Sequence, residues 1–254
     1  MVKRHKLDER RSLLLPGGHN ATIRFAVEHW IQCAQNAIKD HGFFTVALSG
    51  GSTPKKIFQL LSTEYKDALD WNKVFLFWSD ERSVLPSDPE SNYHMAMTEG
   101  GLSTLPIDKG HIFRMVAESD MEKNAKSYSK LIQKHVKNES FDLIMLGMGD
   151  DGHTASLFPN TEALNVKGKL VTPNHVCQKD TWRMTFTFEL INKARNICIY
   201  VLGANKAEIL ASVLLSPLQK EKYPSGNVGT KDHPACWIID DDASKNLLAD
   251  LVVD

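Results

Sequence analysis

The sequence has few of the features that stabilise small secreted proteins. Its 254 residues contain only four cysteines, Cys33, Cys177, Cys198 and Cys236, with no C-x-x-C pair and no zinc-site spacing among them. Scattered thiols of this kind are typical of a reducing compartment. A chain of this length buries about 70–75% of its unfolded surface when it folds. It therefore needs neither a disulfide nor a structural metal to be stable.

Long apolar runs and an excess of one charge are also missing. The run Leu13-Leu14-Leu15 is too short for the core of a signal peptide, and nothing approaches the ~18 apolar residues of a membrane span. Lys and Arg number 30 against 31 Asp and Glu, for a net charge of −1. Such a balance gives no general attraction to nucleic acid or to anionic membranes. We expect a cytoplasmic protein without a nucleic-acid or membrane partner, which holds any anionic ligand through a few local groups.

Hydrophobic periodicity predicts alternating helices and strands. In residues 21–40, Ile23, Val27, Trp30, Ala34 and Ile38 recur at steps of three and four, the spacing of one helix face. Further helices are expected at residues 55–62, 91–100, 118–136, 205–215 and 243–251, and strands at residues 43–49, 74–79, 112–116, 141–146, 184–188, 197–202 and 236–240.

This alternation predicts the fold class. Strands that alternate with helices give a doubly wound, Rossmann-like α/β fold with a mostly parallel sheet and helices on both faces. We expect residues 1–20 to be a mobile amino-terminal segment and residues 21–254 to form a single domain. Ligands of such sheets bind beyond the carboxyl ends of the strands, so the loops at those ends are where functional residues are to be sought.

One such loop is GMGDDGHT, at residues 147–154, and it allows three interpretations. Its spacing fits the G-x-G-x-x-G of a dinucleotide-binding loop, but Asp150 and Asp151 would repel a pyrophosphate, and no acidic ribose ligand follows about 20 residues later. It can instead be an acid–base loop in which Asp151 orients His153, the side chain best suited to proton transfer near neutral pH. The third possibility is a plain turn whose aspartates cap the following helix.

A second loop, SGGSTP, predicts an anion site. It joins a predicted strand to a predicted helix and contains Ser49, Gly50, Gly51, Ser52 and Thr53. Backbone N–H groups and the helix dipole point at the same place in such a loop. Because the G-x-x-x-x-G-K-[ST] pattern of a nucleotide-binding loop is missing, a monophosphate suits it better than a triphosphate. The alternative is an ordinary turn with a helix cap.

Charged residues also stand near the ends of three other predicted strands. Trp78-Ser79-Asp80-Glu81-Arg82 places Asp80 and Arg82 at the end of a predicted strand. Arg183 precedes a strand and Lys206 opens a helix. Each taken singly is most simply a solvated charge, but together with the SGGSTP loop Arg183 and Lys206 can supply the two cations that a phosphate dianion needs.

Taken as a set, these motifs resemble the 6-phosphogluconolactonases, which belong to the glucosamine-6-phosphate deaminase/isomerase-like fold group. The similarity runs through SGGSTP, WSDERSVLPSDPESNYHMA, LGMGDDGHTASLFP, WRMT, GANKAEIL and WIID. It implies hydrolysis of 6-phospho-D-glucono-1,5-lactone to 6-phospho-D-gluconate, in the pentose phosphate pathway, by a carboxylic ester hydrolase.

The resemblance also assigns roles to residues of this chain. It implies that residues 49–53, Arg183 and Lys206 hold the phosphate, that Asn92 binds substrate, and that Asp80, Arg82, Asp151 and His153 serve catalysis. We expect His153 to be the general base. No organic cofactor and no metal ion is expected, because no histidine pair has the spacing of metal ligands and the cysteines are isolated.

Two other functions remain to be considered. The related deaminases read D-E-Y where this chain has Asp80-Glu81-Arg82, and they carry a glutamate where Phe158 stands here. That pattern favours a lactonase over a deaminase. A phosphosugar-sensing transcription regulator would need a helix-turn-helix, and residues 1–18 are too short to contain one.

Overall fold

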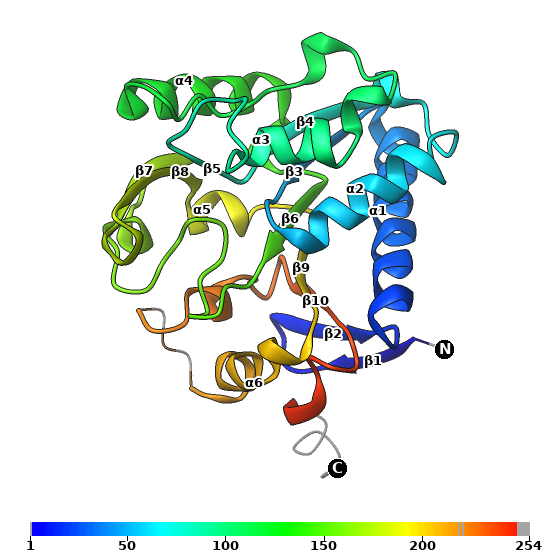
Figure 1. The fold of residues 1–254 in the computed structure, drawn as a ribbon, viewed down its shortest axis with the longest axis vertical. Helices are drawn as coiled ribbons and strands as arrows, with labels where there is room; N and C mark the ends of the chain where they lie inside the picture. The colour runs from blue at the N-terminus through cyan, green and yellow to red at the C-terminus, as the bar shows by residue number, and fades with distance from the viewer. Residues whose placement is uncertain (1, 218, 220, 248–254) are drawn as a thin grey trace.

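A computed structural model describes residues 2–217, 219 and 221–247. Its larger sheet has seven strands in the order β1-β2-β10-β9-β6-β3-β4 (Figure 1). All neighbours in it are parallel except β1 and β2. The strands are β1 Lys3–Lys6, β2 Arg11–Leu15, β3 Phe44–Leu48, β4 Val74–Trp78, β6 Leu143–Gly147, β9 Ile197–Val201 and β10 Ala235–Ile239.

A smaller antiparallel sheet, in the order β5-β8-β7, stands beside the large one. Its strands are β5 Asp80–Arg82, β7 Val171–Val176 and β8 Thr181–Phe186. The α-helices are α1 His19–His41, α2 Ser52–Thr63, α3 Asn92–His94, α4 Met121–His135, α5 Phe188–Ile191 and α6 Ala207–Leu215, and a π-helical turn covers Met95–Glu99. Single 3₁₀ turns cover Trp71–Lys73, Leu102–Thr104, Lys109–His111, Lys137–Glu139, Glu162–Asn165, Cys177–Lys179, Ala204–Lys206 and Pro224–Asn227.

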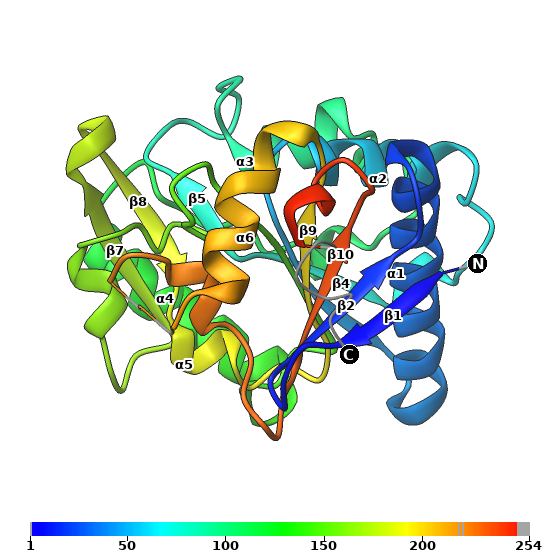
Figure 2. The same ribbon diagram turned by 90° about the horizontal axis from the view of Figure 1, so that it is seen from below.

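The predicted fold class is confirmed, with helices on both faces of the large sheet. Helices α1 and α2 pack against each other on one face, and α6 lies on the opposite face (Figure 2). Connections from β2 to β3 and from β3 to β4 run in one direction along the sheet, whereas those from β6 to β9 and from β9 to β10 run in the other. Neighbouring strands β3 and β6 are therefore the topological switch point, where ligands of doubly wound sheets bind.

The amino-terminal segment differs from expectation. Instead of being mobile, residues 3–15 form the hairpin of β1 and β2, and β2 pairs with β10 at the edge of the sheet. Leu13, Leu14 and Leu15 are buried there. The short apolar run thus belongs to the core, and burial of these three side chains explains why the segment is ordered.

Two further differences concern strands. The strand expected at residues 112–116 is wrong, because only an isolated bridge between Leu76 and Ile112 forms. Strands β5 and β7 were not expected at all. The range of the helix expected at residues 243–251 lies partly outside the described residues, of which the last is residue 247.

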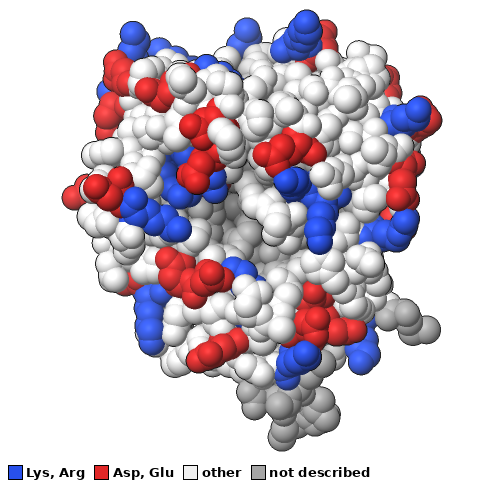
Figure 3. Space-filling model, viewed as in Figure 1, with Lys and Arg blue, Asp and Glu red and all other residues white. Residues whose placement is uncertain are grey.

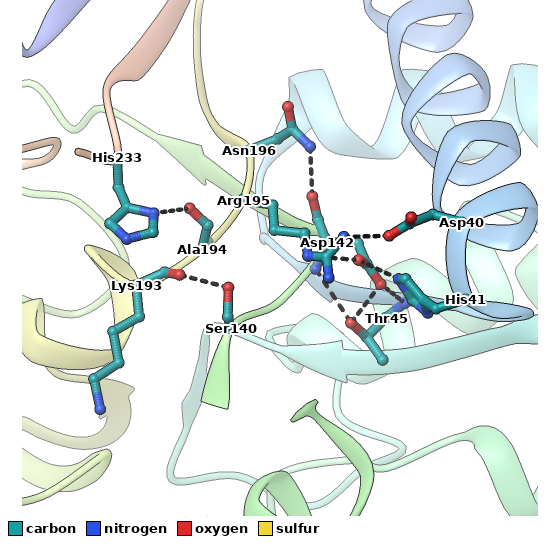
Figure 4. A network of polar contacts seen from close by, with 10 residues as sticks. All are labelled: Asp40, His41, Thr45, Ser140, Asp142, Lys193, Ala194, Arg195, Asn196 and His233. Atoms are coloured by element: carbon teal, nitrogen blue, oxygen red, sulfur yellow. Dashed lines mark hydrogen bonds and ion pairs between the residues drawn. The ribbon is translucent and has the colours of Figure 1, made fainter. Parts of the chain in front are cut away.

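The end of the sheet opposite the switch-point loops is held by a buried carboxylate, Asp142. It accepts hydrogen bonds of 2.9 Å from the backbone N–H and the hydroxyl of Thr45, and its Oδ1 lies 2.9 Å from Nε2 of His41 (Figure 4). The guanidinium of Arg195 lies 3.6 Å away. Asp142 precedes β6, Thr45 lies in β3 and Arg195 precedes β9, so this network fixes the amino ends of three strands that carry site loops at their other ends.

Candidate active site

The candidate site lies at the carboxyl ends of β3 and β6, as predicted. A cavity of about 170 Å³ opens there, lined by Ser49, Gly50, Gly51, Asp80, Arg82, Asn92, Gly147, Met148, Gly149, His153 and Ala155. In the space-filling view the molecule is hollowed near its centre, where β5, β6 and the start of α2 meet, and side chains of both charges surround the hollow (Figure 3). Loops far apart in the sequence therefore meet at one cavity.

The GMGDDGHT loop presents a histidine paired with a carboxylate. Nδ1 of His153 lies 2.5 Å from Oδ1 of Asp151, and the same oxygen accepts the backbone N–H of His153. Burial of Asp151 raises the pKa of its carboxyl, but the hydrogen bond and the charge of His153 outweigh burial, so the pKa lies below its ordinary value. The carboxylate is thus ionised at neutral pH and fixes the orientation of the imidazole.

Two neighbours complete the setting of the imidazole. The ring of His153 stacks on Phe158 with centroids 3.9 Å apart and planes 18° apart. A Cβ atom on Gly149 would lie 2.0 Å from Nδ1 of His153, so only glycine fits at that position. Residues 155–161, all of which the structure describes, form no helix: an isolated bridge joins Thr154 and Leu157, and the next helical turn is Glu162–Asn165. A dinucleotide loop and an aspartate helix cap both need a helix directly after the loop, so neither of these two interpretations agrees with the structure.

The SGGSTP loop connects β3 to α2 as predicted. Helix α2 begins at Ser52, so the first N–H groups of the helix have no carbonyl partner within it. Ser49, Gly50 and Gly51 line the cavity. A Cβ atom on Gly50 would fall 1.9 Å from Oδ1 of Asn92, which shows how closely the loop packs against that side chain.

Asp80, Arg82 and Asn92 also line the cavity. The buried Asp80 accepts hydrogen bonds from Ser156 Oγ at 2.6 Å and from Asn92 Nδ2 at 3.3 Å. The Asn92 amide also donates to the backbone carbonyl of Asp80 at 2.9 Å. Arg82 donates through Nη1 to the carbonyl of Glu90. These contacts leave Asp80 little freedom, which favours a positioning role for its carboxylate.

Arg183 and Lys206, expected beside the phosphate loop, are not among the residues that line the cavity. Arg183 is buried in β8, with its guanidinium 5.3 Å from the centre of the Phe158 ring and 3.5 Å from Ser156 Oγ. Burial lowers its pKa from the ordinary value. Lys206 donates to the carbonyl of Met148 at 2.9 Å and to Asp150 at 2.5 Å. In this arrangement Lys206 is tied to the GMGDDGHT loop.

Sequence reasoning missed Ser156 and Glu81. Both residues are buried. Ser156 donates a hydrogen bond to Asp80, and Glu81 accepts hydrogen bonds from the backbone N–H groups of Arg82 and Asn92. Ser156 lies in the quoted ASLFP segment and Glu81 inside the D-E-R tripeptide. Glu81 could have been recognised from its place between two predicted site residues of one strand. Because successive side chains of a strand point to opposite faces, its carboxylate must point away from the cavity into the protein.

Among residues 2–217, 219 and 221–247, no three or more His, Cys, Asp or Glu side chains are grouped so as to hold a metal ion. Of the helices in that same part of the chain, none combines the length and the apolar character needed to cross a bilayer.

Comparison with known proteins identifies the family. The family model described as glucosamine-6-phosphate isomerases/6-phosphogluconolactonase matches residues 18–237. The chain belongs to this family. A 6-phosphogluconolactonase of Chlamydia pneumoniae is 43% identical over 233 residues, covering 91% of this chain and 89% of that protein. The predicted family, and the preference for a lactonase over a deaminase, are confirmed by this similarity.

Solved structures of the family have the same fold. The 6-phosphogluconolactonase of Thermotoga maritima superposes with a TM-score of 0.76 at 26% identity, covering 91% of this chain and 99% of that one. A monomeric glucosamine-6-phosphate deaminase has a TM-score of 0.75 at 18% identity, covering 92% and 99%. The fold alone is thus common to lactonases and deaminases, and side chains in the site must distinguish them.

Proposed function

We propose that this protein hydrolyses 6-phospho-D-glucono-1,5-lactone to 6-phospho-D-gluconate, the lactonase step of the pentose phosphate pathway, with His153 as general base. The observation that carries the mechanism is the 2.5 Å contact between His153 Nδ1 and Asp151 in a loop that lines the cavity. With Nδ1 occupied by the carboxylate, Nε2 is the nitrogen left to exchange a proton with water.

The reaction begins with the phosphate bound at the SGGSTP loop. Its N–H groups at the start of α2 favour an anion there. Lys206 supplies a cation once its ammonium turns from Asp150 to the phosphate, and Arg183 adds positive charge from behind Phe158. Bound in this way, the phosphate orients the lactone ring toward His153.

Hydrolysis then needs two proton transfers, one from the attacking water and one to the departing ring oxygen. His153 accepts a proton from the water as its oxygen attacks, and Arg82 stabilises the negative charge that gathers on the carbonyl oxygen. When the ring C–O bond breaks, the imidazolium returns the proton to the departing ring oxygen. Asp151 stabilises the imidazolium between these steps, Asn92 binds the sugar, and Asp80 holds both Asn92 and the Ser156 loop in place.

Phe158 argues against ring-opening deamination at the same site. Its ring covers one face of His153 and carries no proton donor or acceptor. A relay from the imidazole to a second carboxylate on that side is therefore impossible, and the histidine has Asp151 as its acidic partner.

A paired assay tests the proposed function. Purified protein is mixed with freshly prepared 6-phosphogluconolactone, and acid release is followed above the spontaneous rate; ammonia release from glucosamine 6-phosphate is measured in parallel. We expect rapid lactone hydrolysis and no ammonia. Ammonia release without lactone hydrolysis would replace the lactonase by a deaminase. The cytoplasmic location remains a prediction of this proposal.

A further inference from the structure

Glu81 is a buried carboxylate that accepts hydrogen bonds from residues of β5 and of the start of α3. Glu81 as a whole residue is 3% exposed. Oε1 accepts the backbone N–H groups of Arg82 and Asn92, both at 2.8 Å. Oε2 accepts the N–H of Tyr93 at 2.9 Å and the hydroxyl of Ser91 at 3.0 Å. Each oxygen thus accepts two hydrogen bonds, the full capacity of an ionised carboxylate.

Strand geometry explains why Glu81 does not face the cavity. Successive side chains of a strand point to opposite faces, and the residues on either side of Glu81 in β5, Asp80 and Arg82, both line the cavity. Glu81 points the other way, toward the start of α3. It therefore ties β5 to the residues that open α3.

The consequence for the site is carried by Asn92. Its backbone is held by Glu81, its Nδ2 donates to Asp80, and its Oδ1 packs on Gly50 of the phosphate loop. One carboxylate thus fixes the backbone of Arg82 and Asn92 and, through Asn92, the spacing between β5 and the loop after β3.

We propose that Glu81 is a positioning residue for lactone hydrolysis: its ionised carboxylate holds Arg82 and Asn92 at the substrate cavity without touching the substrate. This inference rests on the proposed function. Burial raises the pKa of Glu81, against the lowering effect of its four hydrogen bonds. Burying an ionised carboxylate costs desolvation free energy, and the four hydrogen bonds are needed to offset that cost.

The test is Glu81→Gln, with Asp142→Asn as matched control. Each change replaces a buried, hydrogen-bonded carboxylate by an amide of the same shape, but Asp142 precedes β6 and so lies at the end of the sheet away from the cavity. In Glu81→Gln the new NH₂ group replaces an oxygen that accepted two hydrogen bonds. It faces two N–H or O–H donors and cannot accept from either. We expect kcat to fall about 10–100-fold, as for a small misplacement of reacting groups. Asp142→Asn, assayed well below its unfolding temperature, is expected to stay within about twofold of wild type.

A double-mutant cycle separates positioning from general destabilisation. Adding Glu81→Gln to Asn92→Ala should cost less than it does in the wild type, since interacting residues are non-additive and only the effect exerted through Arg82 is left to lose. A merely structural Glu81 would lower kcat by the same factor in both backgrounds, or would lower it no more than Asp142→Asn does. Either result would overturn the inference.

Hydrogen exchange provides a readout that does not depend on the reaction. In Glu81→Gln the amide protons of Asn92 and Tyr93 should exchange at least about tenfold faster, while those of β9 keep their protection. Unchanged protection would refute the positioning role, whatever the activity of the wild type. Inactivity of the wild type on the lactone would refute the proposed function alone. If Glu81→Gln does not fold, Ser91→Ala removes one of the four donors and should accelerate the same two amides; no acceleration would count against the inference.

Discussion

The imidazole of His153 is held on two sides: its Nδ1 lies 2.5 Å from Asp151, and its ring stacks on Phe158 at 3.9 Å. The carboxylate sets the tautomer and the aromatic ring sets the plane. The histidine is thereby oriented before substrate binds, and preorganised groups contribute most to catalysis because nothing has to rearrange during the reaction.

Asp151→Asn tests the carboxylate half of this arrangement. Because the folded-state pKa of Asp151 is lowered, its ionised form contributes stability that is present above the unfolded pKa, about 3.9, and is lost as pH falls through the folded pKa. The difference in unfolding free energy between wild type and Asp151→Asn should therefore shrink from pH 6 to pH 3. Urea unfolding at both pH values measures it; a difference that grows toward pH 3 would contradict the lowered pKa.

The phosphate handle is tested by Lys206→Ala and Arg183→Ala. A hydrogen bond to a charged group contributes about 1.5–3 kcal/mol, so Lys206→Ala should lose roughly tenfold or more in kcat/KM on the phosphorylated lactone and little on glucono-lactone itself. Arg183→Ala should lose less, because its guanidinium lies over Phe158 and acts on the phosphate only through its charge. Lys73→Ala, which also removes a lysine paired with an aspartate, is the control. Preference for the phosphorylated substrate that is undiminished in both variants would eliminate the clamp.

Gly50 is expected to be intolerant of a methyl group. In Gly50→Ala the Cβ atom would fall 1.9 Å from Asn92 Oδ1, so the loop or Asn92 must move. We expect at least about a tenfold loss of kcat/KM from the displaced site. Gly18→Ala, where no atom lies within 4 Å of the added Cβ, should remain fully active. Equal activity of the two variants would show that the loop can move without consequence.

Independence from metal ions is a further prediction. A lactone is an activated ester, and in the proposed mechanism the proton transfers and the stabilisation of charge use only His153, Arg82 and Asp151. Activity should survive chelation with EDTA followed by exhaustive dialysis. Loss of activity that one divalent ion alone restores would require a different mechanism.

Elements with a strong period or a continuous apolar run were predictable from sequence. Residues 21–40 gave a helix close to α1, and the run at residues 43–49 gave β3. The hairpin of β1 and β2 was not, because residues 3–6 are all basic and show no core face, and because β2 finds its parallel partner only in β10, near the other end of the sequence. Nor was β7, since Pro173 weakens any strand prediction and the partner, β8, lies several residues further along.

The same limit applies to the site. Short motifs identified His153 with Asp151 because these residues are two positions apart, and a local contact follows from local spacing. The contact between Ser156 and Asp80 spans 76 residues and depends on how the small sheet packs. Likewise, Arg183 looked suited to bind phosphate directly, but β8 places its guanidinium over Phe158. Roles that depend on tertiary packing could not be derived from spacing.

The most direct test of the account is the pH profile of kcat/KM for wild type and His153→Ala on 6-phosphogluconolactone, corrected for spontaneous hydrolysis. General-base catalysis contributes about 10²–10⁴ in rate. We predict a loss of that order in kcat with little change in substrate binding, and the disappearance of the acidic limb that protonation of the imidazole produces in the wild type. Turnover near that of the wild type, with the acidic limb retained, would contradict the assignment of His153 as the general base.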